Sequence, residues 1–260
     1  MRTNDDGPVN IKRIREYFND PRTVEHYVRA VANIGLWKSE VALIEKWLGR
    51  NDHILDLGCG AGRIALGLWK MGFKRVGGGD LSESMVAEAR DIADHEGAII
   101  DFRCEDATGL SYPEERFDAV IFGFNGLMQI PGRENRRRAL KEVWRVIKPD
   151  GRFIFSTLDR ADLLYRSVFR DPDNFEHNIE RNPNLLEMGD RHFETQYGTT
   201  FMHVPTRDEI VQDLKVTGWF LSEDQMRSEL SDESFSVREF SEDCRFWVVK
   251  KRRRSVTGFL

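Results

Sequence analysis

The 260-residue sequence has few cysteines, little net charge and no long apolar run, and each shortage excludes a class of protein. Its three cysteines, Cys59, Cys104 and Cys244, are far apart and form no Cys-x-x-Cys pair. This pattern predicts neither a disulfide framework nor a cysteine-based zinc site, and it favours a reducing compartment. No apolar run approaches the roughly 18 residues that span a bilayer, and none follows the polar N-terminus. We therefore expect a cytoplasmic protein without a membrane segment.

The charge balance provides little attraction for a polyanion. Lys and Arg number 39 against 44 Asp and Glu, which leaves a net charge of −5. Such a balance disfavours a dedicated nucleic-acid binder. Two basic runs, Arg133–Arg138 and Lys250–Arg254, keep RNA or DNA as a less favoured partner, because runs of this kind are usually solvated faces.

Several catalytic motifs are also missing. The sequence contains no Gly-x-Ser-x-Gly, no His-Glu-x-x-His and no Walker loop. Its six histidines lack metal-ligand spacing, so no metal site is predicted. His192 and His203 are alternatives as proton acceptors, provided that their segment folds over the site.

Short apolar runs alternate with helical segments between residues 53 and 158, which is typical of a parallel α/β sheet. Ala119–Phe122 and Phe153–Phe155 are almost continuously hydrophobic, which indicates strands covered on both faces. Lys148–Gly151 is expected to form a turn before the fifth strand. The expected strands cover residues 53–57, 75–81, 99–103, 117–122, 152–157, 219–221 and 246–249, and the helices cover residues 62–71, 83–96, 133–147 and a segment opened by a Thr206–Glu209 capping box.

The domain organisation follows from where this periodicity starts and fades. Residues 1–48 form a helical prefix, with helices expected from Ile11, Thr23 and Lys38. Residues 49–250 form the main domain, which contains an inserted cap or lid at residues 160–205, where Asp, Asn and Pro accumulate and regular patterning is weak. Residues 251–260 form a basic tail.

A glycine-rich loop follows the first expected strand, in Asp56-Leu57-Gly58-Cys59-Gly60-Ala61-Gly62. Glycines allow close approach of a ligand and positive φ, and the helix that follows offers free N–H groups. A dinucleotide site places its third glycine one residue later, and the Asp56 carboxylate would repel a pyrophosphate. The loop therefore favours a ligand with a cationic amino group, although a tight structural turn is an alternative.

Two further aspartates end the next two expected strands. Asp80 lies 22 residues after Gly58, where a carboxylate can accept hydrogen bonds from a ribose diol. Asp106 ends the third strand, where it can face an exocyclic amine. The carboxyl edge of an open α/β sheet is where its ligands bind. Helix caps or turns are the alternative explanation for these aspartates.

With these motifs in place, the sequence resembles the class I S-adenosylmethionine-dependent methyltransferases. The segments similar to the family are Leu55–Gly62, Gly79–Ser82, Glu105–Ala107, Phe117–Val120 and Ala139–Arg152, and the resemblance weakens after about residue 160. It implies a Rossmann-like, seven-stranded, mostly parallel sheet with helices on both faces. The implied cofactor is S-adenosyl-L-methionine, which leaves as S-adenosyl-L-homocysteine.

The resemblance also implies which residues bind the cofactor. Asp56 would lie under the methionine end, Asp80 would hold the ribose hydroxyls, and Phe124 would lie beside the sulfonium. Gly77–Gly79 departs from the bulkier strand residues usual in the family. The full set of implied cofactor-binding residues is Asp56, Gly58, Cys59, Gly60, Asp80, Leu81, Asp106, Ala107 and Phe124, with Gly58 and Gly60 along the methionyl and ribose groups and Asp106 and Ala107 facing the adenine.

The methyl acceptor is less defined. Gly123–Gly126 differs from the Asn/Asp-Pro-Pro-Tyr of relatives that modify DNA bases or glutamine amides, which favours a small molecule or a short peptide. Asp159, Tyr17 and Trp37 are the candidates for the acceptor pocket, and the Asp159 carboxylate makes an amine slightly preferred. A helix cap at Asp159 and packing of the two aromatic residues are the alternatives. Further candidates are Phe18, His26, Tyr27, Tyr165, Phe169, Phe193 and Tyr197.

The sequence therefore predicts an enzyme that transfers a methyl group by direct in-line displacement. A cofactor-binding subunit or sensor without transfer activity is the main alternative. An RNA methyltransferase and a nicotinamide-dependent oxidoreductase are less favoured.

Overall fold

The computed structural model describes residues 10–162, 187–195 and 198–252. Its main sheet has seven strands in the order β3-β2-β1-β4-β5-β9-β8. Strands β1 to β5 pair in parallel, and β9 runs antiparallel to both β5 and β8. The fold class expected from the sequence is confirmed. The strands are β1 (Ile54–Leu57), β2 (Val76–Asp80), β3 (Asp101–Cys104), β4 (Phe117–Phe122), β5 (Ile147–Thr157), β8 (Phe220–Met226) and β9 (Arg245–Lys250).

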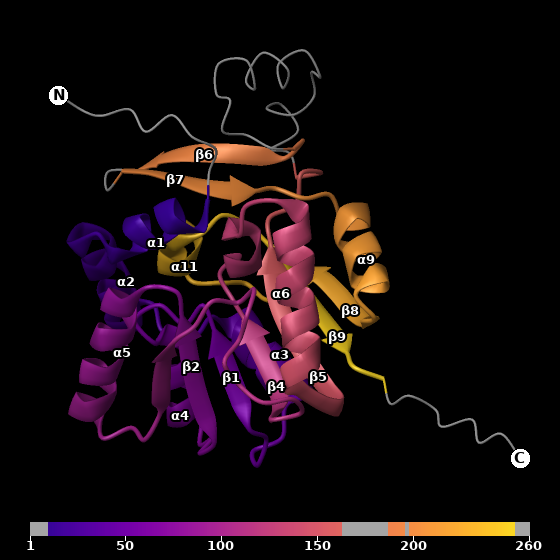
Figure 1. Ribbon diagram of the computed structural model, residues 1–260. Coiled ribbons are helices and arrows are strands. Elements are labelled where there is room, and N and C mark those ends of the chain that lie inside the picture. The colour runs from indigo at the N-terminus through magenta and orange to yellow at the C-terminus, as the bar shows by residue number, and fades with distance from the viewer. Residues whose placement is uncertain (1–9, 163–186, 196–197, 253–260) are drawn as a thin grey trace, which may run out of the picture.

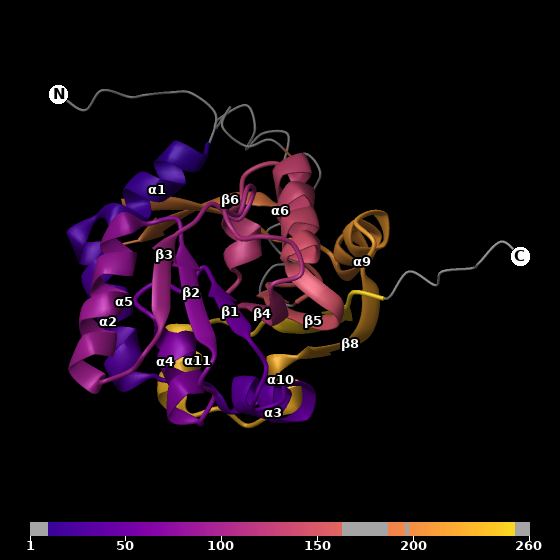
Figure 2. The same cartoon turned by 60° about the horizontal axis from the view of Figure 1, so that its bottom comes forward.

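Helices cover both faces of this sheet (Figure 2). One face carries α6 (Arg133–Val146) and α9 (Arg207–Val216). The other face carries α4 (Arg63–Lys70), α5 (Glu83–Glu96), the second and third N-terminal helices and two short C-terminal helices, whereas the first N-terminal helix packs on α5 and near the strand ends. The three N-terminal helices are α1 (Ile11–Asn19), α2 (Pro21–Asn33) and α3 (Lys38–Trp47). The two C-terminal helices are α10 (Arg227–Leu230) and α11 (Phe235–Phe240).

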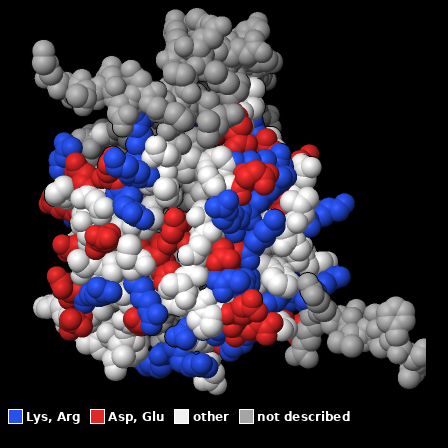
Figure 3. Space-filling view, viewed as in Figure 1, with Lys and Arg blue, Asp and Glu red and all other residues white. Residues whose placement is uncertain are grey.

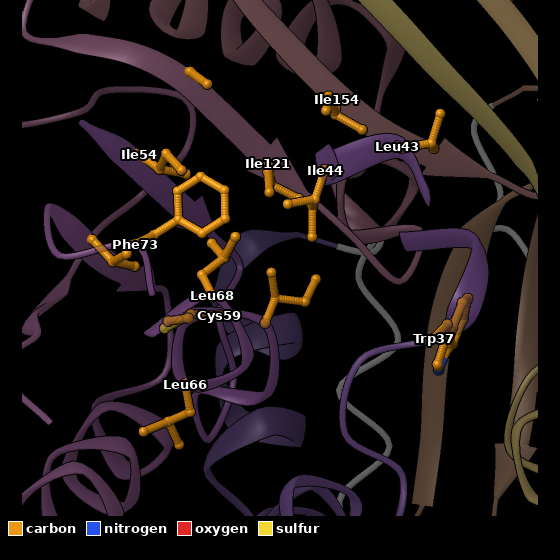
Figure 4. Packing of buried hydrophobic residues seen from close by; sticks show 14 of the residues in the cluster. Trp37, Leu43, Ile44, Ile54, Cys59, Leu66, Leu68, Phe73, Ile121 and Ile154 are labelled. Atoms are coloured by element: carbon orange, nitrogen blue, oxygen red, sulfur yellow. The ribbon is translucent and has the colours of Figure 1, made fainter. Parts of the chain in front are cut away.

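Alternating side chains along the central strands form two hydrophobic cores. Ile121 and Ile154 point to the α3–α4 face, whereas Val120 and Phe153 point to the α6–α9 face. Figure 4 shows part of the first core, in which Ile44 of α3 lies near the strand residues. The period of two along strands that are buried throughout explains why these runs are almost continuously apolar.

The helix boundaries follow capping rules. Asp20 caps α2, which begins at Pro21, and Ser82 caps α5 by accepting a hydrogen bond from the Met85 amide. The predicted capping box at Thr206 and Glu209 is present at the start of α9. Among the described residues, no helix is long and apolar enough to cross a bilayer.

The inserted segment contains regular structure that its sequence did not reveal. Strands β6 (Asp190–Thr195) and β7 (Gly198–His203) form an antiparallel hairpin, which lies across the top of the molecule in Figure 1. The sequence patterns predict no strand between residues 160 and 205. Inter-strand hydrogen bonds and the burial of Phe201 hold the hairpin, and neither is visible as periodicity in so short a segment.

The turn expected at Lys148–Gly151 lies inside β5, which begins at Ile147. Ile147 pairs with Phe117, but the next partner of β4 is Arg152, so the residues between them form a bulge. Asp150 adopts a φ of 65° within it, and its amide donates to the Lys251 carbonyl. The fifth strand therefore starts five residues earlier than expected.

Candidate functional site

A cleft opens at the carboxyl ends of β1, β2, β3 and β4, beneath α1, α2 and α11. It contains about 1020 Å³ of empty space, including solvent at its mouth. Its floor consists of the loops that follow the four strands, and its cover comes from the N- and C-terminal segments. Switch points of this kind in open α/β sheets are where ligands bind.

The loop after β1 needs its glycines. Gly58 and Gly60 have φ values of 66° and 53°, in the left-handed region that favours glycine. A Cβ at Gly58 would lie 2.5 Å from the Phe122 ring. The Gly79 carbonyl accepts hydrogen bonds from the amides of Gly58 and Cys59. The loop is therefore fixed against β2, with its backbone bordering the cleft.

Asp56 is a buried carboxylate at the foot of the cleft. Its Oδ2 accepts a hydrogen bond of 2.9 Å from the Ala65 amide, whereas its Oδ1 has no partner among the described residues. Burial raises the pKa of Asp56 to about 8, against hydrogen bonding by Ala65 and the charge of Arg63, which lower it. An unpartnered buried oxygen of this kind matches a ligand that brings a cationic donor.

Asp80 connects the strand ends to the loop. Its Oδ2 accepts from the Gly60 amide at 2.8 Å, and its Oδ1 accepts from the Ser82 amide at 2.9 Å. Burial raises the pKa of this carboxyl, and the backbone donors oppose the shift. The Ser82 hydroxyl lies 2.9 Å from the Phe18 carbonyl, which ties this turn to the end of α1.

Asp106 and Glu105 follow β3 and also line the cleft. Asp106 Oδ1 accepts from both the amide and the hydroxyl of Thr108, each at 2.8 Å. Glu105 is bonded to the amide and hydroxyl of Ser111. The turn explanation for Asp106 therefore holds for one of its oxygens, while the residue still borders the cleft.

An aromatic group closes the cleft above β4. Phe124 has a φ of 50°, rare for a bulky residue, and Asn125 follows at 60°. The Phe124 ring stacks on Phe240 at 5.0 Å and meets Tyr27 edge-on at 6.0 Å. This conformation turns the chain sharply after β4, and such outliers gather at functional sites.

Of the described residues that line the cleft, Arg63 alone carries a positive charge, and Glu40 compensates it. Its two terminal nitrogens bond both Glu40 oxygens at 2.7 Å, and one of them also bonds the Gly35 carbonyl. Both side chains are buried. The pair joins α3 of the N-terminal segment to the first turn of α4.

All nine residues predicted to bind the cofactor line this one cleft. They are Asp56, Gly58, Cys59, Gly60, Asp80, Leu81, Asp106, Ala107 and Phe124. They come from the ends of four strands, which the parallel topology brings to one edge. Their individual contacts with a cofactor stay predictions.

The three predicted acceptor residues are not among the cleft's lining residues. Asp159 accepts from Arg245 at 3.0 and 3.1 Å and from the Ala161 amide at 2.9 Å. Trp37 is 1% exposed and packs in the core. Tyr17 packs edge-on against Phe18 at 5.1 Å.

The structure adds lining residues that sequence reasoning missed. These are Ile11 and Ile14 of α1, Arg63, Ile64, Gln129, Ile130 and Phe240. The stripe of Ile11, Ile14 and Phe18 along α1 was the available signal, because its helical spacing marks one apolar face. Phe18 and Tyr27, two further candidates from the prefix, do line the cleft.

The histidine alternatives do not lead to the cleft. His203 is buried at the end of β7, and its Nδ1 lies 2.8 Å from Asp190 Oδ1. Glu187 lies near this pair, but Arg136 bonds its carboxylate. The side chain of His192 lies outside the described residues, as do Tyr165, Phe169 and the side chains of Phe193 and Tyr197.

The basic run on α6 is largely neutralised. Arg133 and Arg137 both pair with Asp213 at 2.9 Å. Figure 3 shows Lys and Arg interspersed with Asp and Glu on the viewed face. The run is therefore a partnered helix face, in agreement with the small net charge.

Comparison with known proteins identifies the segment that carries these loops. Residues 54–151 match the family model described as a methyltransferase domain. The chain is 34% identical over 116 residues to a ubiquinone biosynthesis O-methyltransferase of Coxiella burnetii, covering 45% of this chain and 47% of that protein. It is 31% identical over 151 residues to the ubiquinone/menaquinone biosynthesis C-methyltransferase UbiE of Hydrogenovibrio crunogenus, covering 55% and 58%. The chain thus spans about half the length of these curated relatives.

Solved structures share the fold across more of the chain. A SAM-dependent methyltransferase from Methanosarcina mazei aligns with a TM-score of 0.68 at 22% identity, covering 85% of this chain and all of that one. The [4+2]-cyclase SpnF aligns with a TM-score of 0.69 at 17% identity, covering 95% and 98%. A likeness at such identities concerns the fold, which evidently supports more than one reaction.

Proposed function

Residues 54–151 form a class I S-adenosylmethionine-dependent methyltransferase domain, and from this premise we propose that the protein methylates a small-molecule acceptor bound in the cleft. The cofactor is S-adenosylmethionine. The observation that carries the proposal is the unpartnered Oδ1 of Asp56, buried beside two left-handed glycines. The division into a prefix, a main domain and a tail stays a prediction.

The residues present fit this cofactor. Asp56 offers a buried carboxyl group whose unpartnered Oδ1 can accept a hydrogen bond from its ammonium group, and the Gly58–Gly60 backbone leaves room where side chains would intrude. Asp80 has backbone donors on both oxygens, which orient its remaining lone pairs for a ribose diol. Asp106 Oδ2 has no partner among the described residues, which suits an exocyclic amine.

When bound, the cofactor supplies a methyl group on a positively charged sulfur; the acceptor gains the carbon bond as the carbon–sulfur bond breaks, and a hydroxyl or amine acceptor releases one proton. The protein's part is to align the acceptor and exclude water. Phe124, Phe240 and Tyr27 form an apolar cover suited to this role. No triad is required.

A small molecule is the acceptor that the site supports best. The cleft is lined by many apolar side chains and a few polar groups, as small-molecule sites are, and the basic run on α6 is paired with acidic residues. The preference for an amine rested on Asp159, which bonds Arg245 and does not line the cleft. We therefore leave this preference out of the proposal.

Calorimetric titration with S-adenosylhomocysteine tests the cofactor site. Asp80→Ala should weaken binding about 10- to 100-fold, since hydrogen bonds to charged groups contribute about 1.5–3 kcal/mol. Asp101→Ala, an exposed carboxylate on β3, is the matched control and should bind normally. Equal affinities for the two variants would contradict the ribose assignment. Stabilisation by NAD rather than S-adenosylhomocysteine in a thermal shift would favour the oxidoreductase alternative.

Transfer itself is tested with S-adenosylmethionine carrying a labelled methyl group. The protein is incubated with small-molecule, RNA and protein fractions of a bacterial extract. We expect label in the small-molecule fraction alone. Tight cofactor binding without labelling of any fraction would support the alternative of a non-catalytic subunit.

A further inference from the structure

The cleft has two chemically different halves. The charged half comprises the loops after β1, β2 and β3, with Asp56, Asp80, Glu105 and Asp106. The apolar half comes from α1, the end of the 3₁₀ helix η1 (Gly126–Gln129) and α11. Its residues are Ile11, Ile14, Phe18, Gln129, Ile130 and Phe240. If the proposed function holds, the charged half is committed to the cofactor, which leaves the apolar half for the acceptor.

The electrostatics of the cleft disfavour an anionic acceptor. None of the six side chains of the apolar half carries a charge. Arg63, the cation on the wall among the described residues, is bonded through both terminal nitrogens to Glu40. A phosphate, sulfate or carboxylate would find no free counter-charge here and would face the carboxylates of the other half. Burying an unpaired charge is costly, so the apolar half disfavours an anionic acceptor.

Two polar groups at the cleft remain free to bind a ligand. The Gln129 amide and the Tyr27 hydroxyl have no hydrogen-bond partner among the described residues, although both residues are half-buried and line the cleft. Neither group is engaged by another described residue, and an amide both donates and accepts. Burial raises the pKa of Tyr27, which keeps its hydroxyl neutral. An acceptor with one polar group on an apolar body would satisfy this arrangement.

The hairpin holds the apolar wall in place. Phe201 of β7 is 1% exposed and packs with Ile14, Phe18 and Leu81. Strand β7 contacts both α1 and η1, so one element braces both parts of the wall. Figure 1 shows the hairpin above α1. A braced wall discriminates by shape and polarity better than a loose one does.

We infer that the apolar half of the cleft binds an uncharged, mainly apolar compound with a single hydrogen-bonding group, which the Gln129 amide recognises. This inference rests on the proposed function and names its acceptor class. Gln129 is thereby a specificity-determining residue that contacts the substrate. Hydrogen bonding by Gln129 fixes one end of the compound, and Ile11, Ile14 and Ile130 contact its apolar body.

The test uses 2-naphthol, naphthalene and naphthalene-2-sulfonate as probes, with the full chain saturated with S-adenosylhomocysteine. Dissociation constants are measured by saturation-transfer NMR titration. We expect 2-naphthol to bind at least tenfold more tightly than the sulfonate, because both share the ring and differ in charge. Gln129→Leu should weaken the binding of 2-naphthol two- to tenfold and leave the binding of naphthalene unchanged, as expected for the loss of one neutral hydrogen bond.

Ile11→Asp tests the wall without disturbing the core, because Ile11 is 36% exposed. This variant should bind 2-naphthol at least tenfold more weakly than the wild type, while its affinity for S-adenosylhomocysteine stays the same. Ile99→Asp, at an isoleucine that is 81% exposed and away from the cleft lining, is the control and should change neither.

Equal affinity for 2-naphthol and the sulfonate, or no binding of 2-naphthol to the complex, would overturn the inference. Unchanged 2-naphthol binding by Ile11→Asp would do the same. Failure of the protein to bind S-adenosylhomocysteine would instead contradict the proposed function, so the two failures are distinguishable.

Discussion

The charged and apolar halves of the cleft differ in how the chain builds them. The charged half comes from strand ends within residues 56–107, where each loop continues directly from a buried strand. The apolar half joins residues 11–18, residues 129–130 and Phe240, which only the tertiary fold brings together. Short-range rules therefore determine the first half, whereas packing between distant segments determines the second.

Two polar joints stabilise the walls of the cleft. The Arg63–Glu40 pair connects the start of α4, which follows the loop after β1, to α3 of the N-terminal segment. The Ser82 hydroxyl contacts the Phe18 carbonyl, so the turn that holds Asp80 touches the helix that provides the apolar wall. A change at the second joint should affect both halves of the cleft, whereas changes within one half should affect one ligand.

The largest effect is expected from breaking the buried joint with Glu40→Gln. Removal of the charge leaves the Arg63 guanidinium buried without its counter-charge, which should lower the free energy of unfolding by about 3–5 kcal/mol. Urea denaturation measures the loss. The control is Glu96→Gln, which removes the partner of the exposed Lys70 and should cost below about 1 kcal/mol. Similar losses in the two variants would mean that the buried Arg63–Glu40 pair contributes no more to stability than an exposed pair does.

A smaller effect, confined to the charged half, is expected from Gly58→Ala. Gly58 and Gly97 have nearly equal φ values of 66° and 67°, but only Gly58 would bring a Cβ to 2.5 Å from Phe122; Gly97 has open space. Both alanine variants should lose about 1–3 kcal/mol of stability from backbone strain. Only Gly58→Ala should weaken the binding of S-adenosylhomocysteine, by tenfold or more, as measured by calorimetry. Comparable affinities of the Gly58→Ala and Gly97→Ala variants for S-adenosylhomocysteine would show that the loop after β1 accommodates the added methyl group.

The next effect concerns the pH dependence of stability. It distinguishes Asp56, which titrates, from the residues of the apolar half, none of which carries a charge. With its pKa raised to about 8, folded Asp56 keeps a proton that the unfolded chain releases near pH 4. Its contribution to stability is therefore present at low pH and lost as pH rises from about 4 to about 8. Asp56→Asn removes this loss, so its stability relative to wild type should increase by about 1 kcal/mol per pH unit across that window.

Urea denaturation of the two proteins at pH 5, 6, 7 and 8 checks this expectation. Parallel pH profiles would show that Asp56 is ionised in the folded protein throughout. S-adenosylhomocysteine binding to the wild type should tighten over the same interval, because its ammonium group favours the carboxylate form of Asp56.

The contrast between the halves also explains what the sequence predicted. Period-two and helical patterns and a capping box are local features, so the strands of the sheet and its main helices followed from them, whereas the nine cofactor-binding residues followed from the family resemblance of motifs at the strand ends. The β6–β7 hairpin and Phe240 of α11 depend on long-range contacts, which leave no local period. Trp37 and Asp159 had the right residue types for an acceptor site, but burial and Arg245 engage them elsewhere.

The smallest effect is expected from Asp159→Asn. This variant tests whether Asp159, which has a suitable residue type for an acceptor site, lies close enough to the cleft to affect binding. The asparagine oxygen can still accept from the Ala161 amide, and Arg245 keeps its 2.9 Å contact with Asp224. We expect a stability loss of about 1 kcal/mol and no change in S-adenosylhomocysteine or 2-naphthol affinity beyond twofold. Calorimetry and NMR titration measure both. A tenfold loss of 2-naphthol binding would return Asp159 to the acceptor site and show that the apolar half extends to the end of β5.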